Sequence, residues 1–528
     1  MPKPQARTTF ELLTEMAEID PVHEALVDPK TGLRLSYAEL LVAAQGFSRA
    51  LLTSGINHGD RVGILAGNRA EWIIAHFGIT AIGAISVGLN TWASAHELAY
   101  QLEHSAIKLL FLEAEFRDRD FVSLVNEAVQ IAGKLETLQQ CIYFEPNPSS
   151  DTTSWSTFLA RGNAISNEDL NLATSKVAPD NVACLLYTSG STALPKGVPL
   201  LHQGLIENMW GIGERQHLVA EDRLWLAVSL FWSLASVNAL YAVFTHRATI
   251  VLQHHFDSSE ALALIAKERC SVFYGTPNMV TALVEDESLS RHDLSSLQKG
   301  VTIGTSVQVQ RLADLGVSKI CNVYGLTETY GNSTVTDCSL PLAKRIETVG
   351  AVLPGQEIQI IDPVSATPVG VGEVGEITLR GNVTTGYWQD PERTAESFLD
   401  GGWFRTGDLG YLDEGGFLYF RGRLKEMVKT GGINVAPAEV EEILSTHPAV
   451  ELAFVTGIPD ERLDEALAAV IVLRAGHRPD ERALAEHCRA TLARYKTPRY
   501  FRFITPNELP LTTTGKLQRN RLGELFND

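Results

Sequence analysis

The chain has 528 residues, of which 45% are hydrophobic and 20% are charged, a composition typical of a globular protein too long to fold around a single core. Its formal net charge of -19 argues against the basic face that nucleic acid or an anionic membrane surface would require. We therefore expect two or more domains, no nucleic-acid partner, and local groups that bind any anionic ligand.

The N-terminal segment and the cysteines indicate a cytoplasmic protein. The segment "MPKPQARTTFELLTEMAEID" has no apolar signal core, and no stretch approaches the roughly 20 apolar residues that span a bilayer. The cysteines are scattered, with no CxxC pair and no zinc-like spacing to a histidine. We expect reduced thiols and no integral membrane association. The cysteines are Cys141, Cys184, Cys270, Cys321, Cys338 and Cys488.

Strand-like and helix-like segments alternate through the first part of the chain. Residues 36–55 have a helical pattern that opens with a Ser36 cap, has Glu39 three positions later and closes at Gly55. Strands alternating with helices predict an α/β fold with parallel sheets. The short apolar runs expected to form strands are 61–67, 84–90, 108–114, 182–188 and 248–254.

The pattern changes from about residue 345. The segments "EIQIIDP", "GEITLRG" and "GDLGYLDEGGFLYFRGR" read as hairpin pieces and predict a β-barrel-like part. After "GRLKE" (422–426) follows a compact α+β stretch of about 100 residues. The predicted domains are therefore 1–424 and 425–528.

The polar run "YTSGSTALPKGV" (187–198) is a candidate anion-binding loop. It follows a predicted strand at 182–186, and α/β proteins bind ligands at the carboxyl ends of strands. Its glycines allow close approach, its hydroxyls can donate, and Lys196 adds charge. The nucleotide P-loop does not fit, since Pro195 replaces its second glycine and Gly197 its metal-binding hydroxyl. A flexible surface loop remains the alternative on these residues alone.

Four further stretches decide between these interpretations. They are "VYGLTET" (323–329), "GWFRTGDLGYL" (402–412), "GRLKEMVKTGGINVAPAEVE" (422–441) and "PLTTTGKLQRNRL" (510–522). Together with the polar run, they closely resemble the adenylate-forming superfamily of acyl- and aryl-CoA synthetases, stand-alone adenylation domains and beetle luciferases. The resemblance covers essentially the whole chain. It implies that a carboxylate attacks the α-phosphate of ATP to give an acyl-adenylate and pyrophosphate, after which a thiol displaces AMP.

By this resemblance, the loop 188–197 binds the β- and γ-phosphates of ATP. Thr327 is expected to touch the α-phosphate, and Glu328 to ligate Mg²⁺, which prefers carboxylate oxygen. Outside its motif, Glu328 would be read as a solvated surface acid. The phosphate-loop residues are Thr188, Ser189, Gly190, Ser191, Thr192 and Lys196.

The resemblance also assigns a nucleoside site. Asp408 is expected to accept both ribose hydroxyls, with Arg423 reaching the same sugar. Tyr324 is expected to stack on the adenine, although an aromatic residue there could equally be core. Without the family, "TGDLG" would be a turn with an Asx hydrogen bond. The segment 302–306, which includes Gly304 and Thr305, is expected to border the adenine and the reacting carboxylate.

The small domain is expected to supply the catalytic lysine and to rotate between the two half-reactions. Lys516 is expected to bridge the carboxylate and the α-phosphate, as a flexible ammonium can. Lys425 marks the hinge, where many relatives have aspartate. Gly431 and Gly432 are expected to border the pantetheine entrance. The ordinary alternatives are a solvated lysine near the terminus and a simple Gly-Gly turn.

The acid is expected to be apolar, whether fatty, aromatic or alicyclic. Amino-acid-activating relatives carry an aspartate after a phenylalanine, whereas this chain has Trp232 there, and an indole cannot neutralise a buried ammonium. Trp232 as plain core is the alternative. A second departure is Ala193, where a glycine is usual. The expected pocket residues are Phe231, Trp232, Ser236 and Gly304.

These observations predict an ATP-dependent carboxylic acid:CoA ligase with ATP, Mg²⁺ and coenzyme A as cofactors. Because the sequence ends soon after Lys516, we expect the acyl acceptor to be a separate molecule and not a fused carrier domain. The alternatives are a stand-alone ligase that loads a free acyl carrier protein and a non-catalytic adenylate-binding homologue. The oligomeric state stays open, with a homodimer as one alternative.

Overall fold

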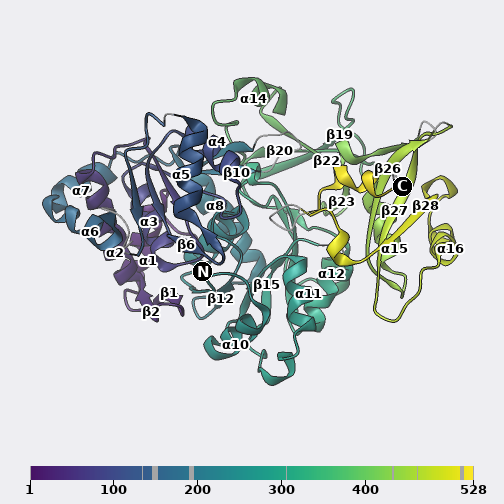
Figure 1. Cartoon of the computed structure of the whole chain (residues 1–528), viewed down its shortest axis with the longest axis horizontal. Coiled ribbons are helices and arrows are strands. Elements are labelled where there is room, and N and C mark those ends of the chain that lie inside the picture. Colours follow the sequence, from purple (N-terminus) through teal and green to yellow (C-terminus); the bar gives the residue numbers. More distant parts are fainter. Residues whose placement is uncertain are drawn as a thin grey trace.

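The computed structural model describes residues 2–133, 135–145, 153–188, 195–304, 306–430, 433–460, 462–511 and 517–526. The chain runs broadly along the long axis of the molecule. Its N-terminal third lies at one end and its C-terminal segment at the other (Figure 1).

A seven-stranded sheet occupies the N-terminal end of the molecule. Its strands pair in parallel except for β10 and β11, which form an antiparallel hairpin at one edge. In sheet order the strands are β11 (Lys196–Leu201), β10 (Val182–Thr188), β4 (Ile85–Gly88), β3 (Arg61–Leu65), β5 (Ile107–Leu112), β8 (Gln140–Tyr143) and β9 (Thr153–Ser154). A separate two-stranded ladder joins β6 (Glu115–Phe116) and β7 (Arg119–Asp120).

A nine-stranded sheet lies beside the first. Its central six strands are parallel, and its two edges are closed by antiparallel strands. In sheet order they are β18 (Ala351–Val352), β17 (Thr334–Val335), β16 (Lys319–Tyr324), β15 (Lys299–Thr302), β14 (Val272–Tyr274), β12 (Arg223–Leu226), β13 (Thr249–Leu252), β1 (Glu24–Asp28) and β2 (Leu33–Ser36). The predicted α/β architecture is thereby confirmed.

Helices pack on these sheets, and the helix predicted for residues 36–55 is confirmed. It runs from Tyr37 to Thr53, with a reciprocal capping box between Ser36 and Glu39 and a positive φ of 76° at Gly55. The helices of this part are α1 (Thr9–Ile19), α2 (Tyr37–Thr53), α3 (Ala70–Ala81), α4 (Ala95–Ser105), α5 (Phe121–Ala132), α6 (Trp155–Ala160), α7 (Asn167–Thr174), α8 (His202–Gln216), α9 (Leu240–Thr245), α10 (Ser258–Glu268), α11 (Pro277–Glu285), α12 (Ser306–Asp314) and α13 (Leu342–Glu347). Across the described ranges, none of the helices could cross a bilayer.

The hairpin pieces predicted after residue 345 form a five-stranded antiparallel sheet. It joins β19 (Gln356–Ile361), β20 (Gly375–Gly381), β22 (Trp403–Leu412), β21 (Phe398–Leu399) and β23 (Leu418–Arg423). Helix α14 (Pro391–Ser397) precedes β21. The small apolar core of the five-stranded sheet includes Tyr324, the last residue of β16. The five-stranded sheet therefore packs directly against the nine-stranded sheet.

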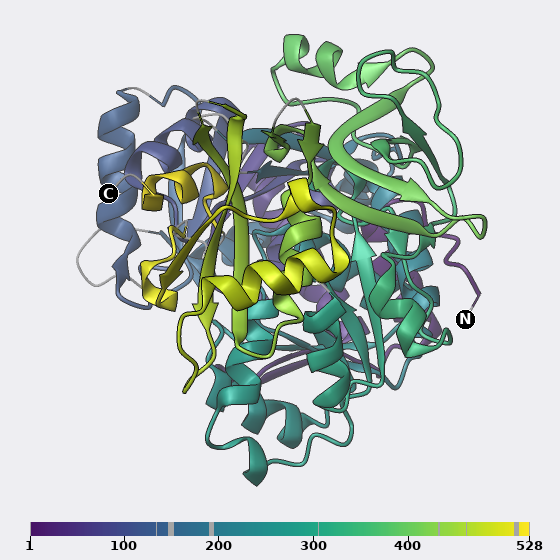
Figure 2. The same cartoon turned by 90° about the vertical axis from the view of Figure 1, so that its right-hand side faces the viewer.

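The C-terminal segment has its own sheet and apolar core, and it faces the viewer in Figure 2. The strands are β25 (Ile433–Val435), β24 (Val428–Thr430), β27 (Asp464–Leu473), β26 (Val450–Asp460) and β28 (Tyr500–Ile504), with helices α15 (Pro437–Ser445) and α16 (Glu481–Thr491). The buried carboxylate of Glu441 holds the end of the chain through two short bonds from Arg519, at 2.6 and 2.8 Å. The boundary between residues 424 and 425 stays a prediction.

Candidate active site

Asp408 lies where the third sheet meets the end of β16. It is 3% exposed and pairs across β22 and β23 with Arg423, whose Nε lies 3.3 Å from Oδ1. The hydroxyl of Tyr324 donates to Oδ2 at 2.9 Å. The predicted ribose residues and the predicted base-stacking residue are therefore in contact. The Tyr324 ring lies 5.7 Å from Phe420 and belongs to the core of this sheet.

The Asp408 carboxylate has an unused acceptor. Within the described part of the chain, its buried Oδ1 receives no hydrogen bond, because the Arg423 contact has the distance of an ion pair but not hydrogen-bond geometry. Burial raises the Asp408 pKa to about 6, while the Arg423 charge and the Tyr324 hydrogen bond oppose this rise. A buried carboxylate with an unsatisfied oxygen suits a ligand that donates hydroxyl hydrogens, as a ribose diol does.

Glu328 lies in a tight turn that follows β16. A Cβ added at Gly325 would lie 2.4 Å from the Asn332 Cα, so the backbone crosses itself closely and only glycine fits. Glu328 is 7% exposed in a short 3₁₀ helix (Thr327–Thr329). Its Oε1 accepts from the Tyr387 hydroxyl at 2.8 Å, and its carbonyl accepts from Thr384 N at 2.6 Å. The motif glutamate is therefore held inward rather than solvated.

Lys196 faces the same tyrosine. It is the first residue of β11 and pairs with Thr188, the last residue of β10, so both belong to strands rather than to the predicted loop. Its Nζ lies 4.8 Å from the centre of the Tyr387 ring. Burial lowers the Lys196 pKa, while the Glu328 charge opposes that shift. Glu328 and Lys196 therefore both contact Tyr387.

Three of the four predicted acyl-pocket residues, Phe231, Trp232 and Ser236, follow β12. Phe231 is buried, Trp232 is half-buried, and their ring centroids lie 5.5 Å apart. Ser236 lies in a π-helical turn (Leu234–Ala239), and its hydroxyl is bonded to the Trp232 carbonyl at 3.1 Å. The hydroxyl of Thr327 donates to Ser233 Oγ at 3.3 Å. The pocket segment is thus joined directly to the expected α-phosphate residue.

Several predicted site residues fall outside the described part of the chain. Gly304 is described and follows β15. Lys425 is described within a 3₁₀ helix, Leu424–Glu426, directly after β23. The residues that lie outside the described ranges are Ser189, Gly190, Ser191, Thr192, Ala193, Thr305, Gly431, Gly432 and Lys516.

Sequence reasoning missed Tyr387 and Ser233. Tyr387 contacts both Glu328 and Lys196, yet it belongs to no quoted motif, and the neighbouring Trp388 amide is what ties its loop to the Gly197 carbonyl at 2.8 Å. Such a contact between distant segments has no periodic signal. The only cue in the sequence is the Gly-Tyr-Trp run after a predicted strand.

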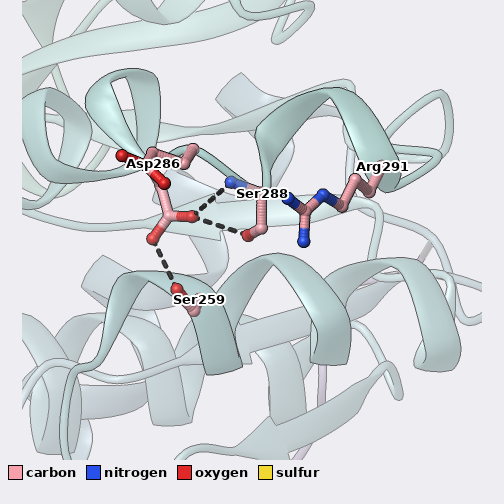
Figure 3. Close-up of a pocket in the computed structure, with 5 residues that line it drawn as sticks. Ser259, Asp286, Ser288 and Arg291 are labelled. Atoms are coloured by element: carbon pink, nitrogen blue, oxygen red, sulfur yellow. Dashed lines mark hydrogen bonds between the residues drawn. The ribbon is translucent and has the colours of Figure 1, made fainter.

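A polar hollow on the surface, between α10 and the segment that follows α11, is a separate feature (Figure 3). At its centre, the Asp286 carboxylate accepts from Ser258, Ser259 and Ser288 at 2.6 to 2.7 Å. These hydrogen bonds lower the Asp286 pKa, led by the bond from Ser258. These hydrogen bonds satisfy the Asp286 carboxylate and tie the segment after α11 to the start of α10.

Two family models match the sequence of this chain. Residues 13–388 match the model described as "AMP-binding enzyme", and residues 439–516 match the "AMP-binding enzyme C-terminal domain". The chain belongs to the AMP-binding enzyme family. Within this family, it is 33% identical over 532 residues to the putative acyl-CoA synthetase YngI of Bacillus subtilis (strain 168), covering 98% of this chain and 96% of that protein.

Solved structures share the fold of this chain. ATP-bound MatB from Rhodopseudomonas palustris matches with a TM-score of 0.85 and 27% identity, covering 98% of this chain and 99% of that one. The anthranilate CoA ligase AuaEII in complex with anthranoyl-AMP matches with a TM-score of 0.83 and 27% identity, covering 99% and 97%. The fold and the family expected from the motifs are confirmed.

Proposed function

We propose that the protein is an ATP-dependent carboxylic acid:CoA ligase, which forms an acyl-adenylate and pyrophosphate and then an acyl-CoA and AMP. The observation that carries the proposal is the buried Asp408 carboxylate with its unsatisfied Oδ1, next to the tyrosine that orders the end of β16. A family member with anthranoyl-AMP bound, at a TM-score of 0.83 over nearly the whole chain, supports the adenylate as the intermediate.

The chemistry requires two negative reactants to meet, so the residues mainly supply charge and orientation. Asp408, when ionised, accepts the ribose hydroxyls and fixes the nucleotide. Lys196 places an ammonium near the phosphates, and Thr327 donates a hydroxyl at the α-phosphate. Lys516 is proposed to bring a second ammonium to the reacting carboxylate from the small domain, with Lys425 as the hinge.

Glu328 is the proposed Mg²⁺ ligand. Mg²⁺ is usually held by one or two carboxylates together with substrate phosphates, and a single buried carboxylate beside a hydroxyl residue fits that donor set. When bound there, the ion would supply positive charge against the triphosphate. The Tyr387 hydroxyl donates to Oε1 and holds that oxygen in place, so the chain's own contribution is orientation.

The proposal extends to the acid and the acceptor. The aromatic Phe231 and Trp232, with Ser236 and Gly304, are proposed to line an apolar acid site. CoA is proposed to enter by Gly431 and Gly432, and a free acyl carrier protein is the alternative acceptor. We propose that the reaction takes place in the cytoplasm. We also propose that residues 425–528 form the small mobile domain.

A pyrophosphate-release screen tests the proposal. The full chain would be incubated with MgATP and a panel of fatty, aromatic and alicyclic acids, alone, with CoA, and with a free carrier protein, and products would be identified by mass spectrometry. We expect acid-dependent pyrophosphate, and acyl-CoA only when CoA is present. ATP binding without pyrophosphate release for any acid would identify a non-catalytic homologue, and thioester on the carrier alone would reassign the acceptor.

A further inference from the structure

Three aromatic rings from two different sheets meet beside the adenylation residues. Trp92, in the loop after β4, lies 5.2 Å from Phe231 at 82° and 5.1 Å from Trp232 at 62°, measured between ring centroids. These are edge-to-face contacts. Phe231 is 4% exposed, whereas both tryptophans are half-buried. We call Trp92, Phe231 and Trp232 the aromatic wall; no quoted motif contains Trp92.

The Trp232 end of the wall is fixed relative to the adenylation centre. Its amide donates to the Ser229 carbonyl at 2.9 Å, and its own carbonyl accepts from the amides of Ala235 and Ser236 at 3.0 Å. The next residue, Ser233, accepts the hydrogen bond from Thr327. A movement of Trp232 would therefore disturb the residue expected at the α-phosphate.

The side-chain amide of one buried residue, Asn68, holds the segment that leads into Phe231 and Trp232. Asn68, 1% exposed, accepts from the Leu230 amide at 2.9 Å and donates to the carbonyls of Val228 and Gln253 at 3.0 and 3.1 Å. Asn68 follows β3 of the seven-stranded sheet, and its partners follow β12 and β13 of the nine-stranded sheet. The Asn68 side chain therefore joins the two sheets next to Phe231, since it bonds the preceding residue, Leu230.

The Trp92 end is fixed by an arginine. The Arg119 guanidinium donates to the carbonyls of Thr91 and Ala93, on either side of Trp92, both at 2.6 Å. The Trp92 amide donates to Asn90 Oδ1 at 2.8 Å. Since charged donors form the stronger hydrogen bonds, the loop cannot swing Trp92 aside without losing two of them.

The two segments also touch at the backbone. A Cβ added at Gly88, the last residue of β4, would lie 3.1 Å from the Phe231 Cα, so an acyl chain cannot pass between them. We propose that Trp92 determines the size of the acid, closing the acyl site so that compact ring-bearing and medium-length acids fit and long straight-chain acids do not. This inference rests on the proposed ligase function.

The test is an acid-length profile of Trp92 variants in the full chain. kcat/KM would be measured by pyrophosphate release for straight-chain acids from butanoate to palmitate, and for benzoate and cyclohexanecarboxylate, in wild type, Trp92→Ala and Trp92→Phe. Trp210→Ala is the matched control, since that half-buried indole lies on α8 beside Lys3. KM for ATP would be measured in parallel.

We expect Trp92→Ala to move the optimum to longer acids, with a gain of about fourfold in relative kcat/KM for each methylene that newly fits. Activity with benzoate should fall by about two- to tenfold through the lost ring contact. Trp92→Phe should lie between, and Trp210→Ala should keep the wild-type profile. KM for ATP should be unchanged in all variants.

Two results would overturn the inference, and they are distinguishable. A wild-type protein that releases pyrophosphate, with the same acid profile in both Trp92 variants, would show that Trp92 does not set acid size while leaving the ligase function intact. A wild-type protein inactive with every acid would overturn the ligase function and this inference with it. If Trp92→Ala fails to fold, the shift in Trp92→Phe decides.

Discussion

Replacing Asp408 by asparagine should stabilise the ligand-free protein. Burial raises the Asp408 pKa from its ordinary 3.8 to about 6. Because the folded state holds the proton more tightly, the penalty for ionisation is absent below the unfolded pKa and complete above pH 6. At 1.36 kcal/mol for each pKa unit, the penalty is about 3 kcal/mol at neutral pH. Asp408→Asn removes the charge with little change of shape.

The measurement is urea unfolding of both proteins at about pH 5 and about pH 8. We expect Asp408→Asn to be more stable by up to about 3 kcal/mol at the higher pH, and the difference to shrink as the pH falls through 6. Saturating MgATP should stabilise wild type more than the variant. The ionised aspartate has two oxygens that can accept the two ribose hydroxyls, whereas the asparagine amide has one.

Asp413, in the turn after β22, provides a control of opposite sign. Although burial opposes its ionisation, hydrogen bonds led by that of Lys344 lower the Asp413 pKa. Asp413→Asn should therefore destabilise the protein, and more so at the higher pH. An Asp408→Asn variant that is no more stable than wild type at about pH 8, or whose advantage is the same at both pH values, would refute the reasoning about a buried carboxylate with a raised pKa.

Three further substitutions test the site. Tyr387→Phe removes the hydroxyl from Glu328, a bond to a charged group worth about 1.5–3 kcal/mol, so KM for MgATP should rise about ten- to hundredfold in the pyrophosphate assay; an unchanged KM would contradict the assigned role. Gly325→Ala forces a Cβ against the Asn332 backbone, so thermal unfolding should show a large loss of stability, and an unchanged midpoint would contradict the close crossing. Lys516→Ala should abolish adenylation but largely spare thioester formation from a preformed adenylate, and equal loss of both half-reactions would count against it.

The fold was predictable where local pattern and tertiary environment agree. The predicted run 61–67 became β3 (Arg61–Leu65) and 108–114 became β5 (Ile107–Leu112), because strands buried on both faces are continuous apolar runs. The predicted loop at 187–198 was drawn too long, since Thr188 and Lys196 pair across a hairpin. Polar strand ends lack the apolar signal, so only the ladder of hydrogen bonds reveals them.

The site divides in the same way. Asp408 and Glu328 could be singled out because their motifs are contiguous in sequence, and their nucleotide and metal roles stay predictions. Tyr387 could not, because its contacts with Glu328 and Lys196 come from segments far apart in the chain. The same holds for Trp92, whose partners follow a different sheet. The assignments for Lys516, Gly431 and Gly432 rest on resemblance alone.

The amide of Asn68 has a consequence for how new substrates could be acquired. It secures the turn that carries Phe231 and Trp232 through main-chain groups only, namely the carbonyls of Leu226, Val228 and Gln253 and the N–H of Leu230. Because these bonds are to the main chain, they do not depend on the side chains of the turn. An aromatic ring can therefore be replaced by a smaller group while the turn keeps its hydrogen bond from Thr327 to Ser233. Acid preference and nucleotide handling can consequently diverge independently, and a laboratory library confined to Trp92 and Trp232 would retain adenylation while its members differ in the acids they accept.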